Sequence, residues 1–353
     1  MPDFIAQAQE RIRSAAANDT PLRIRGGGTK DFLGGEPFGE VLDTRLHSGV
    51  IAYDPSELVL TVKAGTRLAE VEATLAAAGQ CLPFEPPHFG AGATVGGCVA
   101  AGLSGPRRPY AGAVRDYLLG VSLIDGRGDI LRFGGQVMKN VAGFDTFRLQ
   151  AGAMGTLGLI TEVSFKVLPA LQADETRVFE ADARSAIATM NRLAGQPLPL
   201  AAAVHHQGRL KLRLAGNPAA VRAAVAKLGG EAMVDAAAYW TSLREQAHPF
   251  FADTGLPLWR LAVKPTAVPL AGDGIQELID WGGGQRWLRS GRSVDDLRTL
   301  AAVHGGHATA FRHGPRDQAF QPPARAVMAL HQRLKATFDP ARILNRGRLH
   351  PDL

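Results

Sequence analysis

Three glycine-rich segments in the first half of the chain have the composition of phosphate-binding loops. They are Arg25-Gly-Gly-Gly-Thr-Lys30, the long stretch from Pro86 to Asp116, and Gly152 to Gly158. Glycine packs no side chain and costs conformational entropy, so such runs need a compensating reason, and a cradle of backbone N–H groups around an anion supplies one. The second segment also ends on three cations, Arg107, Arg108 and Arg115. Three loops of this kind predict one extended anionic ligand, such as a dinucleotide.

The two commonest nucleotide motifs do not account for these loops. A Rossmann fingerprint needs G-x-G-x-x-G between a strand and a helix, followed about 20 residues later by an acidic ribose ligand. The run that begins at Gly90 lacks the last glycine and follows no buried strand, and Gly152 to Gly158 precedes a strand. A P-loop is excluded because no Gly-Lys-Ser/Thr occurs.

The elements that would position the loops form an α+β pattern. Strand-like runs occupy residues 22–25, 41–43, 49–53, 58–63 and 159–168, and a hairpin at Asp125-Gly126 joins residues 117–124 to 129–133. Thr66 is expected to cap the helix that contains Leu68, Val71 and Leu75.

From Ala170 onward the glycine loops give way to hairpins and amphipathic helices. Strands are expected at residues 176–180, 201–206, 210–214, 256–263, 287–290 and 307–311, and helices at residues 183–194, 218–228, 239–247, 294–304 and 323–338. This order predicts an antiparallel sheet that helices cover on one face.

The first half resembles a known cofactor domain. Arg25-Gly26-Gly27-Gly28, Thr94-Val95-Gly96-Gly97 and Gly155-Thr156-Leu157-Gly158-Leu159-Ile160 resemble, in order and spacing, the FAD-binding domain of the vanillyl-alcohol oxidase and p-cresol methylhydroxylase (PCMH) superfamily. The resemblance implies FAD, with the first two loops around the pyrophosphate and the third beside the adenosine half. The residues implied to contact FAD are Arg25, Gly26, Gly27, Gly28, Thr29, Lys30, Thr94, Val95, Gly96, Gly97, Gly155, Gly158 and Ile160.

Two alternatives bear on the cofactor. Some of the glycines could serve only to make tight turns. Many superfamily members attach FAD through a histidine soon after the first loop, whereas this chain has Thr29 and Lys30 there. The resemblance therefore implies non-covalent FAD, and Cys98 is expected to be a small buried packing residue.

The second half narrows the resemblance. Leu258 to Pro265, Val303 to Ala308, and the tail from Phe338 through Asn345 to Arg348 resemble the FAD-binding E subunits of bacterial glycolate oxidases over nearly the whole chain. Those subunits work with a longer flavin subunit (D) and an iron–sulfur subunit (F), and together they oxidise glycolate to glyoxylate. The tail then implies that Asn345 belongs to the cofactor site.

Three parts of the chain follow from this resemblance. Residues 1–169 are expected to form the two-part PCMH-type FAD-binding domain, and residues 170–322 an antiparallel-sheet cap domain for the substrate. Residues 323–353 are expected to form a helix and a tail that return to the flavin domain.

Oxidation of a 2-hydroxy acid needs a cation for the carboxylate and a base for the hydroxyl proton. On a strand, Arg260 and Lys264 would share one face, which suits a small carboxylate, although an exposed face with paired charges is an equal alternative. His304 and His307, separated by two glycines, are the candidate bases, with His205, His206 and Tyr239 behind them. No nearby carboxylate supports a metal site.

The composition of the chain limits the classes of function that it could have. The chain has 46% hydrophobic residues, 20% charged residues and a net charge of +6, without a basic helix or a ~20-residue apolar run, so we expect neither nucleic-acid binding nor a membrane span. With no signal peptide recognised, we expect a cytoplasmic chain that reaches a membrane only through its complex. Two cysteines cannot hold an iron–sulfur cluster, so electrons bound for a quinone must leave through another chain.

The sequence thus predicts the FAD-binding subunit of a glycolate-oxidising complex. Two alternatives stay open. The chain could be a stand-alone FAD dehydrogenase for another 2-hydroxy acid such as D-lactate, or a non-catalytic subunit that holds a flavin for assembly and electron relay.

Overall fold

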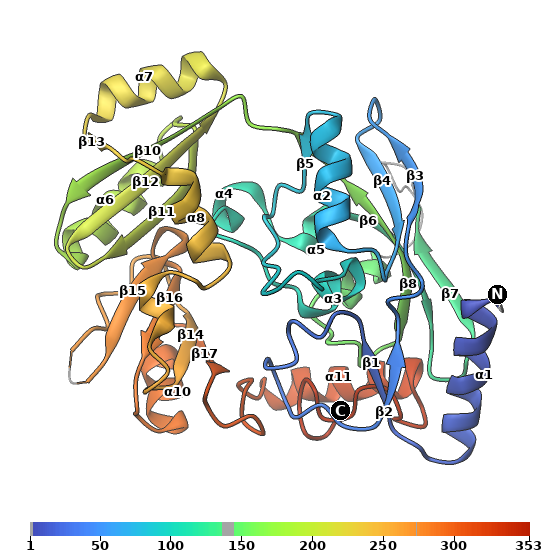
Figure 1. Ribbon diagram of the computed structural model, residues 1–353. Helices are drawn as coiled ribbons and strands as arrows, with labels where there is room; N and C mark the ends of the chain where they lie inside the picture. Colours follow the sequence, from blue (N-terminus) through green and yellow to red (C-terminus); the bar gives the residue numbers. More distant parts are fainter. Residues whose placement is uncertain (1–2, 136–144, 273) are drawn as a thin grey trace. The chain divides into compact units, whose positions relative to one another are not determined.

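The computed structural model describes residues 3–135, 145–272 and 274–353, which divide into two compact units. Unit 1 comprises Met1–Leu103, Ala113–Pro169 and Pro322–Leu353, and unit 2 comprises Ser104–Gly112 and Ala170–Gln321. The chain therefore leaves unit 1 for nine residues, contributes Ser104–Gly112 to unit 2, and returns. Figure 1 shows the elements of both units along the chain.

The larger sheet of unit 1 is antiparallel and has the strand order β3-β4-β8-β6-β7. Its strands are β3 (Val50–Asp54), β4 (Val59–Lys63), β6 (Leu118–Ile124), β7 (Ile130–Gly134) and β8 (Leu159–Lys166). Helices α2 (Leu68–Ala77) and α3 (Val95–Ala101) bury Val71, Leu75 and Val99 in one core with Leu60, Val163 and Phe165 of this sheet. The core thereby anchors two of the glycine segments, because the second segment contains α3 and the third directly precedes β8.

A second layer of unit 1 brings the two ends of the sequence together. Strands β1 (Leu22–Arg25) and β2 (Glu40–Asp43) pair in parallel, and Leu22 also bridges Leu344 of the tail. Helix α1 (Phe4–Ala17) buries Ile12 against this pair, and α11 (Arg325–Phe338) leads into the tail (Figure 1). Shorter elements are β5 (Gln80–Cys81), β9 (Leu168–Pro169), α5 (Val114–Tyr117) and η1 (Thr146–Gln150).

Two local predictions in unit 1 are corrected. Thr66 does not cap α2, because its hydroxyl donates to the Lys63 carbonyl (2.7 Å) and accepts from the Gly49 N–H (2.9 Å), which leaves Arg67 at the N-cap. The segment from Thr94 to Gly97 is not a free loop. It forms the N-cap and first turn of α3, where Thr94 Oγ1 accepts from the Gly97 N–H at 3.3 Å.

Unit 2 is built on one eight-stranded sheet with the order β13-β10-β12-β11-β15-β16-β14-β17, in which every pair is antiparallel. The strands are β10 (Ala173–Glu180), β11 (Leu200–His206), β12 (Arg209–Gly216), β13 (Glu231–Ala232), β14 (Leu258–Ala262), β15 (Gln276–Asp280), β16 (Gln285–Arg289) and β17 (His307–Arg312). Strand β15 was not predicted, although it joins the two halves of the sheet.

Helices lie on both faces of this sheet. On one face, α6 (Ala183–Ala194), α7 (Pro218–Leu228) and α10 (Val294–Val303) pack into two apolar clusters. On the other, α8 (Ala236–Arg244) and α9 (Pro249–Ala252) place Trp240 on Thr176 (2.8 Å) and Phe251 on Trp287 (5.5 Å between ring centroids). The remaining elements are α4 (Arg108–Ala111) and η2 (Trp281–Gly283). The α+β class is confirmed, and the expectation of one covered face is incomplete.

Candidate functional site

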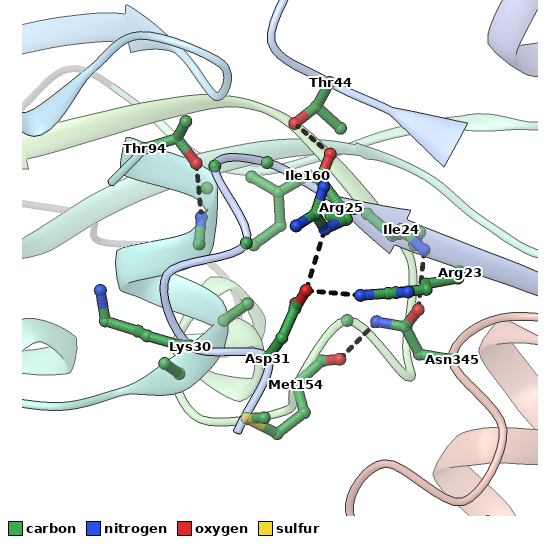
Figure 2. A pocket seen from close by; sticks show the side chains of 18 of the residues that line it. Arg23, Ile24, Arg25, Lys30, Asp31, Thr44, Thr94, Met154, Ile160 and Asn345 are labelled. Atoms are coloured by element: carbon green, nitrogen blue, oxygen red, sulfur yellow. Dashed lines mark hydrogen bonds and ion pairs between the residues drawn. The ribbon is translucent and has the colours of Figure 1, made fainter. Parts of the chain in front are cut away.

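An open pocket of about 820 Å³ lies in unit 1, where the three glycine segments meet (Figure 2). Its lining includes every residue expected to contact the cofactor except Val95, namely Arg25, Gly26, Gly27, Gly28, Thr29, Lys30, Thr94, Gly96, Gly97, Gly155, Gly158, Ile160 and Asn345. The side chain of Val95 is fully buried in the core, so only its backbone could contact a ligand. Four separate parts of the sequence thus converge on one pocket.

The first two segments approach so closely that a side chain could not fit between them. A Cβ added to Gly27 would lie 1.6 Å from the carbonyl oxygen of Gly92. Such contact with backbone requires a glycine, since a backbone atom cannot move aside as the end of a side chain can. The backbones of the two segments are therefore in direct contact at Gly27, which also lines the pocket.

The charges in the pocket are strongly unbalanced. Four cations line it, Arg23, Arg25, Lys30 and Arg348, against the single carboxylate of Asp31. Asp31 Oδ2 lies 2.5 Å from the Arg23 guanidinium and 2.9 Å from Arg25 Nε (Figure 2), and Lys30 Nζ donates to the His88 carbonyl at 3.2 Å. The excess positive charge, with the first turn of α3 beside it, favours a phosphate-rich ligand.

The tail holds the third segment in place through Asn345. Its Oδ1 accepts from the Ile24 N–H at 2.8 Å and its Nδ2 donates to the Met154 carbonyl at 2.6 Å (Figure 2). Gly155 has φ +73°, and a Cβ on it would lie 2.6 Å from Asn345 Nδ2. Asn345 therefore joins β1 to the third glycine segment by direct hydrogen bonds.

Several lining residues were not predicted from the sequence, namely Arg23, Asp31, Thr44, Ala64, Met154 and Arg348. Arg23 alternates with Arg25 on one strand, which was a usable signal. Arg348 donates to carbonyls of Gly35 and Asp31 more than 300 residues away, and no local pattern indicates that contact. Its neighbour Arg346 lies elsewhere, paired with Asp19 on the surface.

These features fit FAD. Glycine cradles that a Cβ would fill, an excess of cations and four converging segments match a dinucleotide with two phosphates. The buried thiol of Cys98 is a poor attachment point, because burial raises its pKa to about 12.

The residues proposed for chemistry lie in unit 2. In the strand register, Arg260 faces Thr309 on β17 and Ala262 faces His307, so Arg260 and His307 share one sheet face. The Arg260 guanidinium lies 5.5 Å from the Phe311 ring centroid. Burial lowers the pKa of Arg260 to about 10, and the charge of Arg108 adds to this effect. Within the described parts of the chain, Arg260 has no carboxylate or hydrogen-bonding partner.

His307 and His304 differ in their surroundings. His307 is exposed at the start of β17, but partial desolvation of its ring, followed by the charge of Arg260, lowers its pKa, which favours the neutral ring near pH 7. His304 ends α10, and its carbonyl accepts from the Lys264 N–H at 3.2 Å. Lys264 is exposed and lies against Gly305, so its side chain follows the turn, whereas Arg260 lies over Phe311.

Two of the other candidate bases, His206 and Tyr239, belong to a separate aromatic cluster on the same unit. His206 stacks edge-on with His248 and Phe250, and Lys211 lies over the ring of Tyr239 at 4.7 Å. Burial lowers the pKa of His206 to about 4, with His248 as the next cause. His205 Nε2 donates to the Ala181 carbonyl (2.9 Å), which gives that ring a structural partner.

The described residues lack two features that would point to other functions. None of their helices is long and apolar enough to cross a membrane. No group of three or more His, Cys, Asp or Glu side chains among them is arranged to hold a metal ion.

Comparison with known proteins agrees with the pocket. Residues 1–134 match the family model described as an FAD binding domain. The chain is 44% identical to the Escherichia coli glycolate oxidase subunit GlcE over 99% of both chains. It is 32% identical to the Bacillus subtilis glycolate oxidase subunit GlcD over 44% of this chain and 33% of that protein.

The fold itself recurs in a solved structure, an alkyldihydroxyacetonephosphate synthase, with a TM-score of 0.66, 17% identity, and coverage of 96% of this chain and 74% of that one. At this identity the likeness shows the fold alone. FAD is the cofactor that the family model and the pocket indicate together. With 44% identity over almost its full length, the chain belongs to the family of the glycolate oxidase subunit GlcE, a family of FAD-binding oxidoreductases.

Proposed function

We propose that this chain is the FAD-binding subunit of a glycolate oxidase complex that converts glycolate to glyoxylate. The observation that carries the proposal is the full-length alignment with a relative named as a glycolate oxidase subunit. In this reading unit 1 is the PCMH-type flavin domain, with FAD held non-covalently, and unit 2 is the cap that binds the 2-hydroxy acid. The tail from Pro322 belongs functionally with the flavin domain.

FAD, when bound, supplies a two-electron acceptor for the oxidation. The pocket residues would hold it as follows: the Gly26 to Lys30 and Thr94 to Gly97 segments would bind the pyrophosphate, while Gly155, Gly158 and Ile160 would contact the adenosine half. Arg25 and Lys30 would contribute charge, and Asn345 would keep the third segment against β1.

In the cap, Arg260 would hold the carboxylate of the substrate, because among the described residues it lies over the Phe311 ring without a carboxylate or hydrogen-bonding partner. His307 would accept the proton of the substrate hydroxyl at a ring nitrogen, since its lowered pKa keeps it neutral near pH 7. Lys264 and His304, which we also proposed from sequence, would then shape the adjoining turn, where the Lys264 ammonium group adds positive charge.

Electrons must then leave through partners. The chain has only two cysteines, which cannot ligate an iron–sulfur cluster. We therefore propose an iron–sulfur subunit (F) as electron acceptor and a longer flavin subunit (D) as the third member. The chain would work in the cytoplasm and approach a membrane only through that complex.

An anaerobic titration of the FAD-loaded chain with glycolate tests the proposal. We expect the yellow flavin absorbance to bleach, and protein precipitation to release free FAD into the supernatant. Arg260→Met should abolish the bleaching while FAD content stays unchanged. A chain that releases FAD but does not bleach, alone or with its partners, would contradict substrate oxidation at this subunit and favour electron relay.

A further inference from the structure

The arginine-rich end of the second glycine segment is part of the cap. Ser104–Gly112 belongs to unit 2, where Trp281 Nε1 donates to the Gly105 carbonyl at 3.1 Å. The Arg108 guanidinium lies over the Trp281 ring, 4.5 Å from its centroid. Arg107 and Arg108, two of the three arginines that the sequence associated with an anionic ligand, therefore lie on the unit that carries Arg260.

This short segment carries an unusual number of unsatisfied polar atoms. Ser104 Oγ, Arg107 Nε and the Tyr110 hydroxyl are buried and have no hydrogen-bond partner within the described residues. Most buried polar groups in native proteins are satisfied, and each unsatisfied one costs free energy. The Tyr110 hydroxyl lies at the Trp281–Gly283 turn, 3.1 Å from where a Cβ on Gly282 would be. Three such atoms within seven residues indicate a polar ligand.

The strand register relates this turn to Arg260. Asp280, directly before Trp281, faces Gln285 on β16, and Gln285 faces Ala262 on β14. Ala262 lies one same-face step from Arg260 and opposite His307. Arg108 lies over the Trp281 ring, and its positive charge contributes to the lowered pKa of Arg260.

The charges on this face favour an anion. Arg108 and Arg260 are cations, and the nearby acid, Asp280, accepts hydrogen bonds from Trp281 N (2.7 Å) and Gln285 Nε2 (3.1 Å). Two guanidinium groups that repel each other beside unsatisfied donors gain stability when a carboxylate lies between them.

We propose that Arg108 is a second substrate-binding residue, which together with Arg260 holds the carboxylate of the 2-hydroxy acid, while the Tyr110 hydroxyl donates to the same ligand. This inference rests on the proposed function, because it assigns the substrate carboxylate to unit 2. It also explains why Ser104–Gly112 belongs to unit 2, because this segment would supply a cation and a hydroxyl group to the substrate site.

Oxalate binding to the full-length, FAD-loaded chain tests this without turnover. Titration calorimetry should show that Arg108→Met weakens oxalate affinity by about 10- to 100-fold, the loss typical of one charge-assisted hydrogen bond. Arg108→Lys should recover part of the affinity. The matched control is Arg115→Met, since Arg115 is exposed and pairs with Asp116 at 3.7 Å, and it should leave the affinity unchanged.

The outcomes separate the two proposals. If Arg260→Met abolishes oxalate binding and both Arg108 variants bind as the wild type does, Arg108 has no part in the site and the proposed function stands. If the wild-type chain does not bind oxalate, or Arg260→Met binds it normally, both the carboxylate site and the role of Arg108 are overturned. If Arg108→Met misfolds, as judged by FAD content and melting temperature, Arg108→Lys with Tyr110→Phe decides the matter by the same titration, because each should then weaken binding.

Discussion

Lys335 in unit 1 and Arg260 in unit 2 are both cations removed from water, yet their surroundings are opposite. Lys335 is 1% exposed, and its ammonium group contacts three oxygens, namely Asp339 Oδ2 (2.8 Å) and the carbonyls of Leu344 (2.7 Å) and Thr156 (2.9 Å). Arg260 is partly buried and, among the described residues, lies against the Phe311 ring without any oxygen partner. Burial is the largest cause of the lowered pKa of both groups.

The difference indicates what each cation does. Asp339, itself fully buried, also accepts from the N–H groups of Ile343 and Leu344, so the Lys335–Asp339 pair folds the tail that carries Asn345 to the cofactor pocket. A buried charge whose hydrogen-bonding groups all have partners, such as Lys335, stabilises the fold. Arg260 is only partly buried and has no carboxylate or hydrogen-bonding partner among the described residues, so it retains the capacity to bind an anionic ligand.

The largest effect should follow from loss of the charge at Lys335. Lys335→Met leaves Asp339 buried without its cation, and breaking a buried pair in this way costs about 3–5 kcal/mol of unfolding free energy. Urea unfolding monitored by tryptophan fluorescence measures the loss. Arg333→Met, an exposed position on the same helix, is the matched control and should change stability little. Equal stability of the two variants would mean that Lys335 is no more important than a surface cation.

A smaller effect is expected at Asn345. Asn345→Ala would leave the Ile24 N–H and the Met154 carbonyl without partners, which costs about 1–3 kcal/mol for each group, and would loosen the third glycine segment. FAD affinity, measured by quenching of flavin fluorescence, should fall by at least tenfold. Asn18→Ala is the control, because the Asn18 side chain donates to the Ser14 carbonyl at the exposed end of α1, away from the pocket residues. Unchanged FAD affinity would remove Asn345 from the cofactor site.

The two sites also differ in how far the sequence predicted them. Glycine runs reflect local backbone requirements, so the loops around Gly27 and Gly155 can be predicted without any knowledge of tertiary contacts. The first turn of α3 was mistaken for a loop because Gly96 and Gly97 obscured the helical spacing of Val95, Cys98 and Val99.

Long-range contacts could not be predicted in this way. Strand β15 is only five residues long and lies between glycine-rich turns, and its role depends on pairing with β16 and with a residue of β11 some 70 positions earlier. A domain boundary drawn after residue 169 likewise cannot show that Ser104–Gly112 belongs with unit 2. The sequence therefore indicates that Arg108 is a cation near an anionic ligand, but it does not indicate that Arg108 belongs to unit 2.

A moderate, pH-dependent effect is expected in the aromatic cluster of unit 2. The pKa of His206 is lowered to about 4, from about 6.5 in the unfolded chain, by burial and then by the charges of His248, Lys211 and His205. Because the unfolded chain binds the proton more readily, stability is complete above pH 6.5 and falls as the pH drops toward 4, by at most about 1.4 kcal/mol per pH unit for this group. His206→Gln should flatten the slope of unfolding free energy between pH 6.5 and 4.5. An unchanged slope would assign the acid sensitivity to other groups.

The smallest effect on stability is expected at Arg260, where the comparison with a buried paired cation can be made within one sheet. Arg286 on β16 is fully buried and bonds Glu277 (2.8 Å) and the carbonyls of Gly283 (2.8 Å) and Ala267 (2.7 Å). Arg286→Met should therefore cost about 3–5 kcal/mol, as Lys335→Met does, because Glu277 is left buried without its partner. Arg260→Met breaks no ion pair or hydrogen bond among the described residues and removes a cation repelled by Arg108, so its unfolding free energy should stay within about 0.5 kcal/mol of the wild type. Urea unfolding of the two variants without added substrate measures the difference. A large loss of unfolding free energy for Arg260→Met would mean that Arg260 is a structural cation like Lys335. It would then no longer support a substrate site at Arg260.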